Sequence, residues 1–299
     1  MTSWAQSAML PSAVRLSAEN TAVVIDSTAD LPDPQSRHSN WRLVPLYVRF
    51  GDETFREYVD LSAEEFYRRL RESAEPPKSA QPSPGDFQAV FESLGEYERI
   101  LCVLLSAKIS GTHESARLAA ESAGGGRVSV IDSGVTSGGT VILGDAIQRR
   151  LEAGTEDGEI DALVERFRRE RGLLFTVDTL EYLIRGGRIG KASGLAGQLL
   201  SVKPILFFDD GEVAPLKRVR GRGKALAELE RIFAEGTEDA TTLHIGVGHA
   251  DAQADAEDLA ARLRSARPHA SFDFLLTLGP VIGTHGGPGT LGLFWFDDP

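Results

Sequence analysis

The chain has almost no cysteine and no long hydrophobic run. Its single cysteine among 299 residues, Cys102, lies in the apolar run 100–105, so we expect a buried core thiol and no disulfide framework. This sparse use of cysteine fits a cytoplasmic location. The absence of about 18 consecutive apolar residues argues against a transmembrane helix. Residues 1–20 lack a basic segment followed by an apolar one, so we expect an N-terminal extension rather than a secretory signal.

Positive charge is also scarce. The sequence carries 32 Lys and Arg against 44 Asp and Glu, which gives a formal net charge of −12. Such a chain repels nucleic acids and anionic membranes as a whole, so we expect no nucleic-acid partner. Basic residues nevertheless gather in two short stretches, either as solvated surface charge or for a local anionic partner, and transient membrane contact stays open. The stretches hold Arg185, Arg188 and Lys191, and Lys217, Arg218, Arg220, Arg222 and Lys224.

Strand-like apolar runs alternate with amphipathic stretches, which predicts an α/β fold with mainly parallel sheets. The length of 299 residues and the apolar content of 41% suit two globular domains. We place the boundary near Arg171, between an N-terminal α/β domain of residues 21–170 and a C-terminal α/β domain of residues 171–299. Residues 44–60 and 279–292 are expected to be loops.

Small polar residues follow the second predicted strand, in the stretch LSAKISGTHESARLAA. Ligands of open α/β sheets bind beyond the carboxyl ends of the strands, which makes this junction a candidate site. Gly111 lets a backbone come close, the hydroxyls of Ser110 and Thr112 can donate hydrogen bonds, and the helix N-terminus favours an anion. Alternatively, Ser110 or Thr112 only caps the helix. By the same argument, the polar residues that end two other strands are pocket candidates: Asp26, Ser27 and Ser133.

Motifs of catalysis and metal binding are largely absent from the sequence. Neither a Gly-x-Ser-x-Gly elbow nor a Walker loop occurs. Residues 287–292 match Gly-x-Gly-x-x-Gly, but they lie too close to the C-terminus for a dinucleotide-binding unit. The six histidines show no metal-ligand spacing, so we expect no metal and no cofactor. His285 lies among glycines, where a backbone loop could bring it to a ligand.

Several segments together resemble the DegV family of bacterial fatty-acid-binding proteins. The resemblance spans about residues 21 to 296, and its most specific part surrounds residues 185–206. The matching segments are VIDSTADLP, SAQPSPGDF, LSAKISGTHESARLA, VIDSGVTSGG, VDTLEYLIRGGRIGKASGLAGQLLSVKPIL, DGEVAPLKRVRGRGKA and GPVIGTHGGPGTLGLFW.

The resemblance implies a two-domain protein that binds one long-chain fatty acid in a tunnel between its domains. It implies that the carboxyl group is held by Ser79 and Ser110, with Arg185 and His285 beside it. Gly111 and Thr112 would belong to the same pocket, together with the strand-end residues named above. Arg188 and the basic residues Lys217, Arg218, Arg220 and Arg222 would face a separate fatty acid kinase subunit, which converts the bound acid to an acyl-phosphate for phospholipid metabolism.

Two positions depart from the family pattern. Ser79-Ala80 stands where a Thr-Ser pair usually precedes Gln-Pro, so one hydroxyl is missing from the head-group network. His113 stands where Tyr usually follows Ser-Gly-Thr. These departures leave the expected fold intact and leave the preferred acyl chain open.

Two other functions stay open at the level of the sequence. A serine-dependent hydrolase could use Ser110 as nucleophile and His285 as its base. A binding protein for a small polar anion, such as a sugar phosphate, could use the same junction with a short, wet pocket. Because the sequence lacks a catalytic constellation, we expect a lipid-binding subunit without enzymatic activity of its own.

Overall fold

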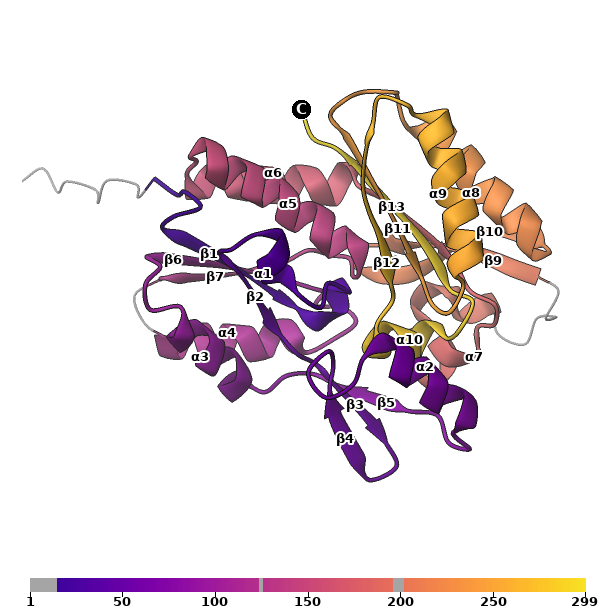
Figure 1. The fold of residues 1–299 in the computed structure, drawn as a ribbon, viewed down its shortest axis with the longest axis horizontal. Helices are drawn as coiled ribbons and strands as arrows, with labels where there is room; N and C mark the ends of the chain where they lie inside the picture. The colour runs from indigo at the N-terminus through magenta and orange to yellow at the C-terminus, as the bar shows by residue number, and fades with distance from the viewer. Residues whose placement is uncertain (1–14, 124–125, 196–201) are drawn as a thin grey trace, which may run out of the picture.

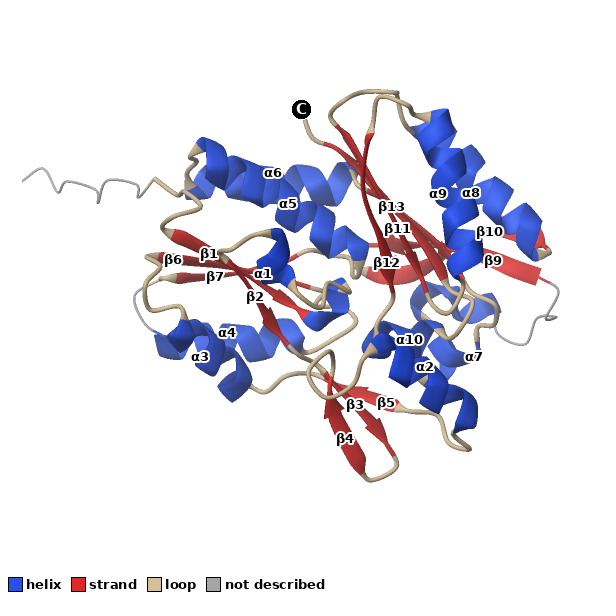
Figure 2. Cartoon of the chain, in the orientation of Figure 1, coloured by secondary structure: helices blue, strands red, loops and turns tan. Residues whose placement is uncertain are grey.

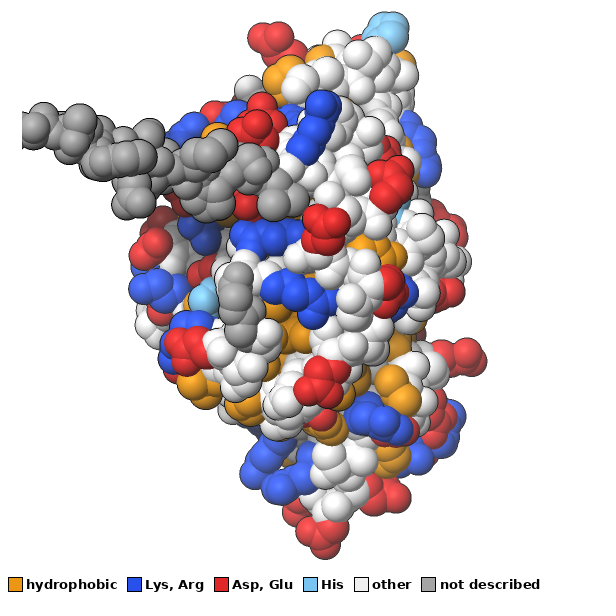
Figure 3. Space-filling view, turned by 90° about the vertical axis from the view of Figure 1, so that its left-hand side faces the viewer, with side chains coloured by type: hydrophobic (Ala, Val, Ile, Leu, Met, Phe, Trp, Pro, Cys, Tyr) orange, Lys and Arg blue, Asp and Glu red, His pale blue; other side chains and the backbone are white. Residues whose placement is uncertain are grey.

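The computed structural model describes residues 15–123, 126–195 and 202–299 (Figure 1). Its helices flank two main sheets, and a smaller sheet projects at the bottom of the view (Figure 2). None of the described helices is long and apolar enough to cross a bilayer. On the face drawn in Figure 3, acidic and basic side chains are interspersed, which is ordinary for a solvated protein surface.

The first sheet is parallel and carries helices on both faces. Its neighbouring strands are β2 (Trp41–Val44), β1 (Thr21–Asp26), β6 (Arg99–Leu104) and β7 (Val128–Asp132), in that order. Helices α3 (Pro84–Ser93) and α4 (Thr112–Ala123) cover one face, while α5 (Gly138–Ala153) and α6 (Asp157–Glu170) cover the other. Cys102 is buried in this sheet, as predicted.

The second sheet is mixed, where we expected a mainly parallel one. Its strands, in spatial order, are β10 (Glu212–Arg220), β9 (Val202–Asp209), β8 (Gly172–Thr176), β13 (Leu291–Asp297), β11 (Leu243–His249) and β12 (Ser271–Thr277). Strands β11 and β12 are parallel, and the other described pairs are antiparallel. The difference arises because Asp210-Gly211, both at positive φ, turn β9 directly back into β10, and because β13 inserts between β8 and β11. The α/β class itself is confirmed.

Helix α5 is shared by the two sheets. One continuous hydrophobic core joins Val23 and Leu101 of the first sheet, residues of α5 and α6, and Phe294 of the second sheet. Gly138, the first residue of α5, allows this closeness, because a Cβ there would lie 2.6–2.7 Å from the rings of Phe274 and Phe294. Helices α8 (Arg222–Gly236) and α9 (Gln253–Ala266) cover the outer face of the second sheet.

A small antiparallel sheet forms an arm below the two main sheets. It contains β4 (Glu53–Arg56), β3 (Tyr47–Phe50) and β5 (Lys78–Ala80), and the arm includes α2 (Ala63–Glu72). The expected loop over residues 44–60 is therefore wrong: residues 47–50 and 53–56 pair as an antiparallel hairpin about a Gly51-Asp52 turn, with Val48 opposite Phe55.

A second segment expected as a loop is also regular. Residues Pro280–Gly286 form helix α10, although the segment is rich in glycine. Pro280 at its first position suits a helix start, and tertiary packing against α2 and α7 (Glu181–Arg185) supports it. His285 therefore stands on a helix and not in a loop.

The N-terminal extension is shorter than expected. Leu16 is buried in the shared core, and its backbone exchanges hydrogen bonds of 2.8 and 3.0 Å with Thr155. Residues 15–20 are therefore part of the fold, while residues 1–14 lie outside the described residues. Residues Gly190–Leu195 form a 3₁₀ turn.

Candidate functional site: a cavity between the sheets

A mainly apolar cavity opens between the first sheet, the arm and the second sheet. It encloses about 920 Å³ of space free of protein atoms, its open mouth included. Apolar side chains from the second sheet, from α7 and α10, and from segments that follow strands supply most of its wall: Leu46, Leu105, Ile109, Leu173, Phe175, Leu183, Phe208, Val213, Leu278, Val281, Ile282 and Phe294. Such a wall suits a hydrocarbon chain better than a polar molecule.

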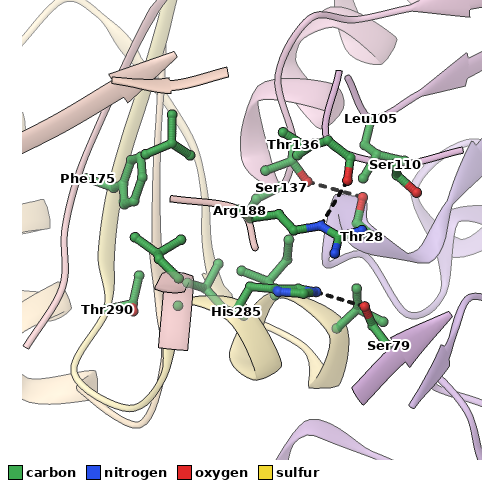
Figure 4. Close-up of a pocket in the computed structure, with 18 of the residues that line it drawn as sticks. Thr28, Ser79, Leu105, Ser110, Thr136, Ser137, Phe175, Arg188, His285 and Thr290 are labelled. Carbon is green, nitrogen blue, oxygen red and sulfur yellow. Dashed lines mark hydrogen bonds between the residues drawn. The ribbon is translucent and has the colours of Figure 1, made fainter. Parts of the chain in front are cut away.

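Polar side chains gather on one side of this cavity. Figure 4 shows them opposite Phe175 and Thr290, most of them contributed by the N-terminal half of the chain. They are Thr28, Ser79, Gln81, Ser110, Thr136, Ser137, Arg188 and His285. Of the four head-group residues expected from the sequence, Ser79, Ser110 and His285 line the cavity.

Ser79 and His285 are in direct contact. Ser79 lies on β5 of the arm and His285 on α10, and the hydroxyl oxygen is 2.7 Å from Nε2 of the imidazole (Figure 4). The buried Nδ1 has no hydrogen-bond partner among the described residues and faces Gly186, where a Cβ would lie 2.1 Å away. Burial, aided by the nearby charge of Arg188, lowers the pKa of His285 to about 4. The imidazole is therefore neutral near pH 7.

Arg188 crosses from the second half of the chain to the first. Its Nε donates to the carbonyl of Ile109 at 3.0 Å, and Nη1 donates to the carbonyl of Gly186 at 2.7 Å. These two bonds fix the guanidinium while Nη2 keeps its donors for other partners. Among the described residues, no carboxylate lies within 4 Å of this guanidinium. Arg188 is therefore a half-buried cation at the polar side of an apolar cavity, where an anionic ligand could pair with it.

Ser110 combines the two roles that the sequence left open. Its hydroxyl oxygen accepts a hydrogen bond from the backbone N–H of Thr112 at 3.3 Å, as a helix cap does, and lies 2.8 Å from the Thr112 hydroxyl. Ser110 also lines the cavity, so its own O–H can donate to a ligand. Thr112 is buried behind it, and Gly111 packs against the side chain of Gln81, which donates to the Gly111 carbonyl.

The strand-end candidates lie behind the cavity wall and are not among its lining residues. Asp26 is buried and accepts hydrogen bonds from Thr28 and from the backbone N–H of Leu105, and burial raises its pKa. Ser27 bonds to Glu57, and Ser133 is buried beside Val135. Each of these three side chains accepts a hydrogen bond from a nearby backbone N–H and so stabilises the backbone behind the cavity wall.

The residues that face the cavity follow these strand ends by a few positions. Thr28, Thr136 and Ser137 were not singled out in the sequence, although they lie within VIDSTADLP and VIDSGVTSGG. The hydroxyl of Thr136 donates to that of Thr28 at 3.2 Å. The signal was present in the motif, but which hydroxyl turns inward depends on the backbone: Ser137, for example, has a positive φ of 59°.

Arg185 stands outside the cavity, in contrast to the position expected for a head-group residue. It forms an ion pair with Glu181 along α7 and is exposed. It lines a second depression that adjoins the first and shares Ser79, Arg188 and His285 with it. Lys78 also lines this outer depression, so its wall is cationic.

The second basic stretch lies apart from the cavity, on β10 and the start of α8. Lys217 pairs with Glu228 at 2.8 Å, and Arg222 pairs with Asp255 at 2.7 Å while donating to the carbonyl of Gly289. Arg218 and Arg220 are exposed on β10, which is the edge strand of its sheet. Among the described residues, no group of three His, Cys, Asp or Glu side chains could hold a metal ion.

The fold and cavity define an α/β protein with two main sheets and a mainly apolar cavity between them. The model of the DegV family, described as an uncharacterised protein family, matches residues 20–298, and the chain belongs to that family. A relative from Thermotoga maritima called fatty acid-binding protein is 34% identical, with 90% of this chain and 95% of the relative covered.

Two solved structures show the same fold. A DegV family protein from Thermus thermophilus, described by its fatty acid binding, superposes with a TM-score of 0.87 at 34% identity, covering 93% of this chain and 99% of the other. DegV from Bacillus subtilis, described as a fatty acid binding protein, gives 0.84 at 33% identity, with the same coverage.

Proposed function

We propose that this chain binds a long-chain fatty acid in the cavity, with its carboxyl group against Arg188, Ser79, His285 and Ser110. The observation that carries the proposal is Arg188: a fixed, half-buried guanidinium without a carboxylate partner among the described residues, facing an apolar space. A fatty acid supplies both the anion and the hydrocarbon. The names of the two solved relatives and of the Thermotoga protein support the same ligand class.

The hydrocarbon chain would supply most of the affinity. Each buried methylene contributes roughly 0.8 kcal/mol, so about 15 of them give an upper limit near 12 kcal/mol before the costs of association. The head-group contacts would mainly set the orientation of the ligand, because hydrogen bonds exchanged with water gain little net free energy.

The bound carboxyl group would be presented to a separate kinase subunit. The cationic outer depression adjoins the head-group residues and could take the phosphoryl group of an acyl-phosphate beside Arg185 and Lys78. The exposed Arg218 and Arg220 on β10 are candidates for contact with that subunit. In this account the chain is not itself an enzyme and needs no metal or cofactor.

A hydrolase is the second candidate, because Ser79 lies 2.7 Å from the His285 imidazole. The nucleophile of the pair would be Ser79 and not Ser110, whose hydroxyl contacts Thr112. Two features weaken this reading: no carboxylate among the described residues orients Nδ1, and a pKa of about 4 makes His285 a weak base. Turnover of model acyl esters that is lost in Ser79→Ala would favour the hydrolase.

Titration with carboxylates of increasing length tests the proposal. We expect hexadecanoate to bind at least a thousandfold more tightly than octanoate, because eight methylenes differ between them. Butanoate should bind hardly at all. A small-anion protein would instead bind butanoate or inorganic phosphate as well as hexadecanoate.

In Ser110→Ala, affinity for hexadecanoate should fall about tenfold, because a hydrogen bond to the carboxyl group is lost. Ser93→Ala, at an exposed position, is the matched control and should leave the affinity unchanged.

A further inference from the structure

Two buried carboxyl groups meet the first turn of α10. Oδ1 of Asp30 accepts a hydrogen bond from the backbone N–H of Gly279 at 2.7 Å, and Oε1 of Glu57 accepts one from Val281 at 2.7 Å. Asp30 is 1% exposed and Glu57 0% exposed. They come from distant parts of the chain: Asp30 follows β1, and Glu57 follows β4 in the arm. Together they tie the first sheet and the arm to the helix that carries His285.

The remaining carboxyl oxygens reach the cavity wall. Ser137 donates to Oδ2 of Asp30, and Ser27 donates to Oε2 of Glu57. Ser27 in turn accepts the backbone N–H of Leu46 at 2.8 Å. Ser137, Leu46 and Val281 all line the cavity. The network is therefore one layer behind the wall, and each of its members holds a wall residue that comes from a different segment.

No cation among the described residues pairs with these carboxyl groups. The titratable groups that face them are Asp26, Tyr58 and Tyr67, and Tyr58 donates to Asp30 at 3.3 Å. Burial raises the pKa of Asp30 to about 7, and the charge of Asp26 adds to that rise. Burial, followed by the charge of Asp30, raises the pKa of Glu57 well above its ordinary value.

Helix α10 is short, so its first turn controls the position of His285. His285 lies four residues after Val281, about 6 Å along the axis. On its other side the helix presses against α2, where a Cβ at Gly283 would lie 2.6 Å from Phe66. A helix held at its start and pressed along one face has little freedom to tilt.

We propose that Asp30 and Glu57 are positioning residues of the head-group site, which anchor the start of α10 and thereby hold His285 against Ser79. The proposal rests on the proposed function, because it assumes that the carboxyl group of a fatty acid binds beside His285 and Ser79. Neither residue touches the ligand, so each acts through α10. The arm and α10 would move apart if the anchor were lost, since Ser79 lies on the arm and His285 on the helix.

The test compares Glu57→Gln with Glu57→Ala in protein labelled at histidine. Gln can still accept the Val281 N–H through its amide oxygen, and its amide nitrogen can donate to the Ser27 hydroxyl oxygen. The His285 imidazole signals and the affinity for hexadecanoate should therefore stay within twofold of wild type. Ala removes the bond to Val281, so the His285 signals should shift and the affinity should fall at least tenfold. The exposed Glu53→Ala on the same arm is the control and should change neither.

The proposal is overturned if folded Glu57→Ala keeps the wild-type His285 signals and affinity. If Glu57→Ala does not fold, Glu57→Asp serves instead, because its shorter side chain cannot span from Val281 to Ser27. Unchanged His285 signals in that variant would equally overturn the proposal. Wild-type protein that refuses hexadecanoate would contradict the proposed function alone, since the His285 signals still report whether the anchor positions the helix.

Discussion

At the scale of single residues, the proposed head-group site is built from groups that already have part of their hydrogen bonding satisfied. Ser110 caps α4 and still faces the cavity, and Arg188 is fixed by two backbone carbonyls. Ser79 and His285 hold one another at 2.7 Å. Because these side chains are already ordered, a ligand that binds them would lose little free energy to the ordering of side chains.

The two arginines of the Arg-Gly-Gly-Arg turn should separate binding from phosphorylation. We expect Arg188→Ala to weaken hexadecanoate binding by about 2 kcal/mol, since it removes a charged donor at the cavity wall. Arg185→Ala should bind normally and lose phosphorylation by the proposed kinase subunit. Calorimetry and a phosphoryl-transfer assay measure the two effects. The sequence interpretation had assigned the opposite roles, and the reverse pattern of losses would restore it.

At the scale of elements, α10 and the β3–β4 hairpin show what sequence patterns miss. Glycine-rich 279–292 has poor helix propensity, and only packing against α2 and α7 makes Pro280–Gly286 helical. By contrast, α3 was predictable, because Ser83 caps it, Pro84 begins it, and Phe87 and Phe91 are buried at helical spacing. Local signals therefore predicted the elements whose stability is local.

The packing of Gly138, at the N-terminus of α5, against Phe294 should limit the length of acyl chain that the cavity accepts. In Gly138→Ala the added Cβ would lie 2.6–2.7 Å from Phe274 and Phe294, and Phe294 lines the cavity. We expect a loss of about 1–3 kcal/mol in stability, as for overpacked cores, and a preference for shorter acids. Thermal unfolding and titration with octanoate and hexadecanoate check both effects.

A matched control for this substitution lies on the neighbouring helix. Gly158→Ala in α6 has nothing within 4 Å of the added Cβ, so it should leave the chain-length preference unchanged. Its stability should stay the same or rise by up to about 1 kcal/mol. An unchanged acid preference in Gly138→Ala would contradict the idea that Phe294 limits the cavity.

At the scale of the whole molecule, the sequence predicted the fold class better than the layout of the sheets. Motifs around Ser79, Ser110 and His285 predicted residues that the structure brings to one cavity. The sequence could not predict that the second sheet is mixed. The relative direction of its strands depends on the insertion of β13 between β8 and β11, and contacts between distant segments determine that position. The division into domains at Arg171 remains a prediction, while the shared core across α5 joins both halves.

The buried Asp30 gives the molecule a pH dependence of known sign. Its pKa of about 7 lies above the ordinary 3.8, so the folded state favours the protonated form, and this contribution is lost as the pH rises toward and through 7. Asp30→Asn cannot ionise. Relative to that variant, wild type should lose about 1–3 kcal/mol between about pH 5 and pH 8. Urea unfolding at both pH values measures the difference.

The comparison with Asp30→Asn cancels the opposite contribution of His285. Burial lowers the pKa of His285 to about 4, so that residue costs stability as the pH falls below its ordinary 6.5, equally in both proteins. Stability curves that run parallel for wild type and Asp30→Asn would show that Asp30 is ionised throughout the range. The anchor of α10 would then involve a charged carboxylate.

The central claim is that the cavity between the sheets holds a fatty acid. Mass spectrometry of an organic extract from the natively purified protein tests it most directly. We expect about one long-chain fatty acid per chain, and a marked loss of it in Arg188→Ala prepared in the same way. An extract without lipid, from protein that also fails to bind added hexadecanoate, would contradict the account and favour a small polar anion as the ligand.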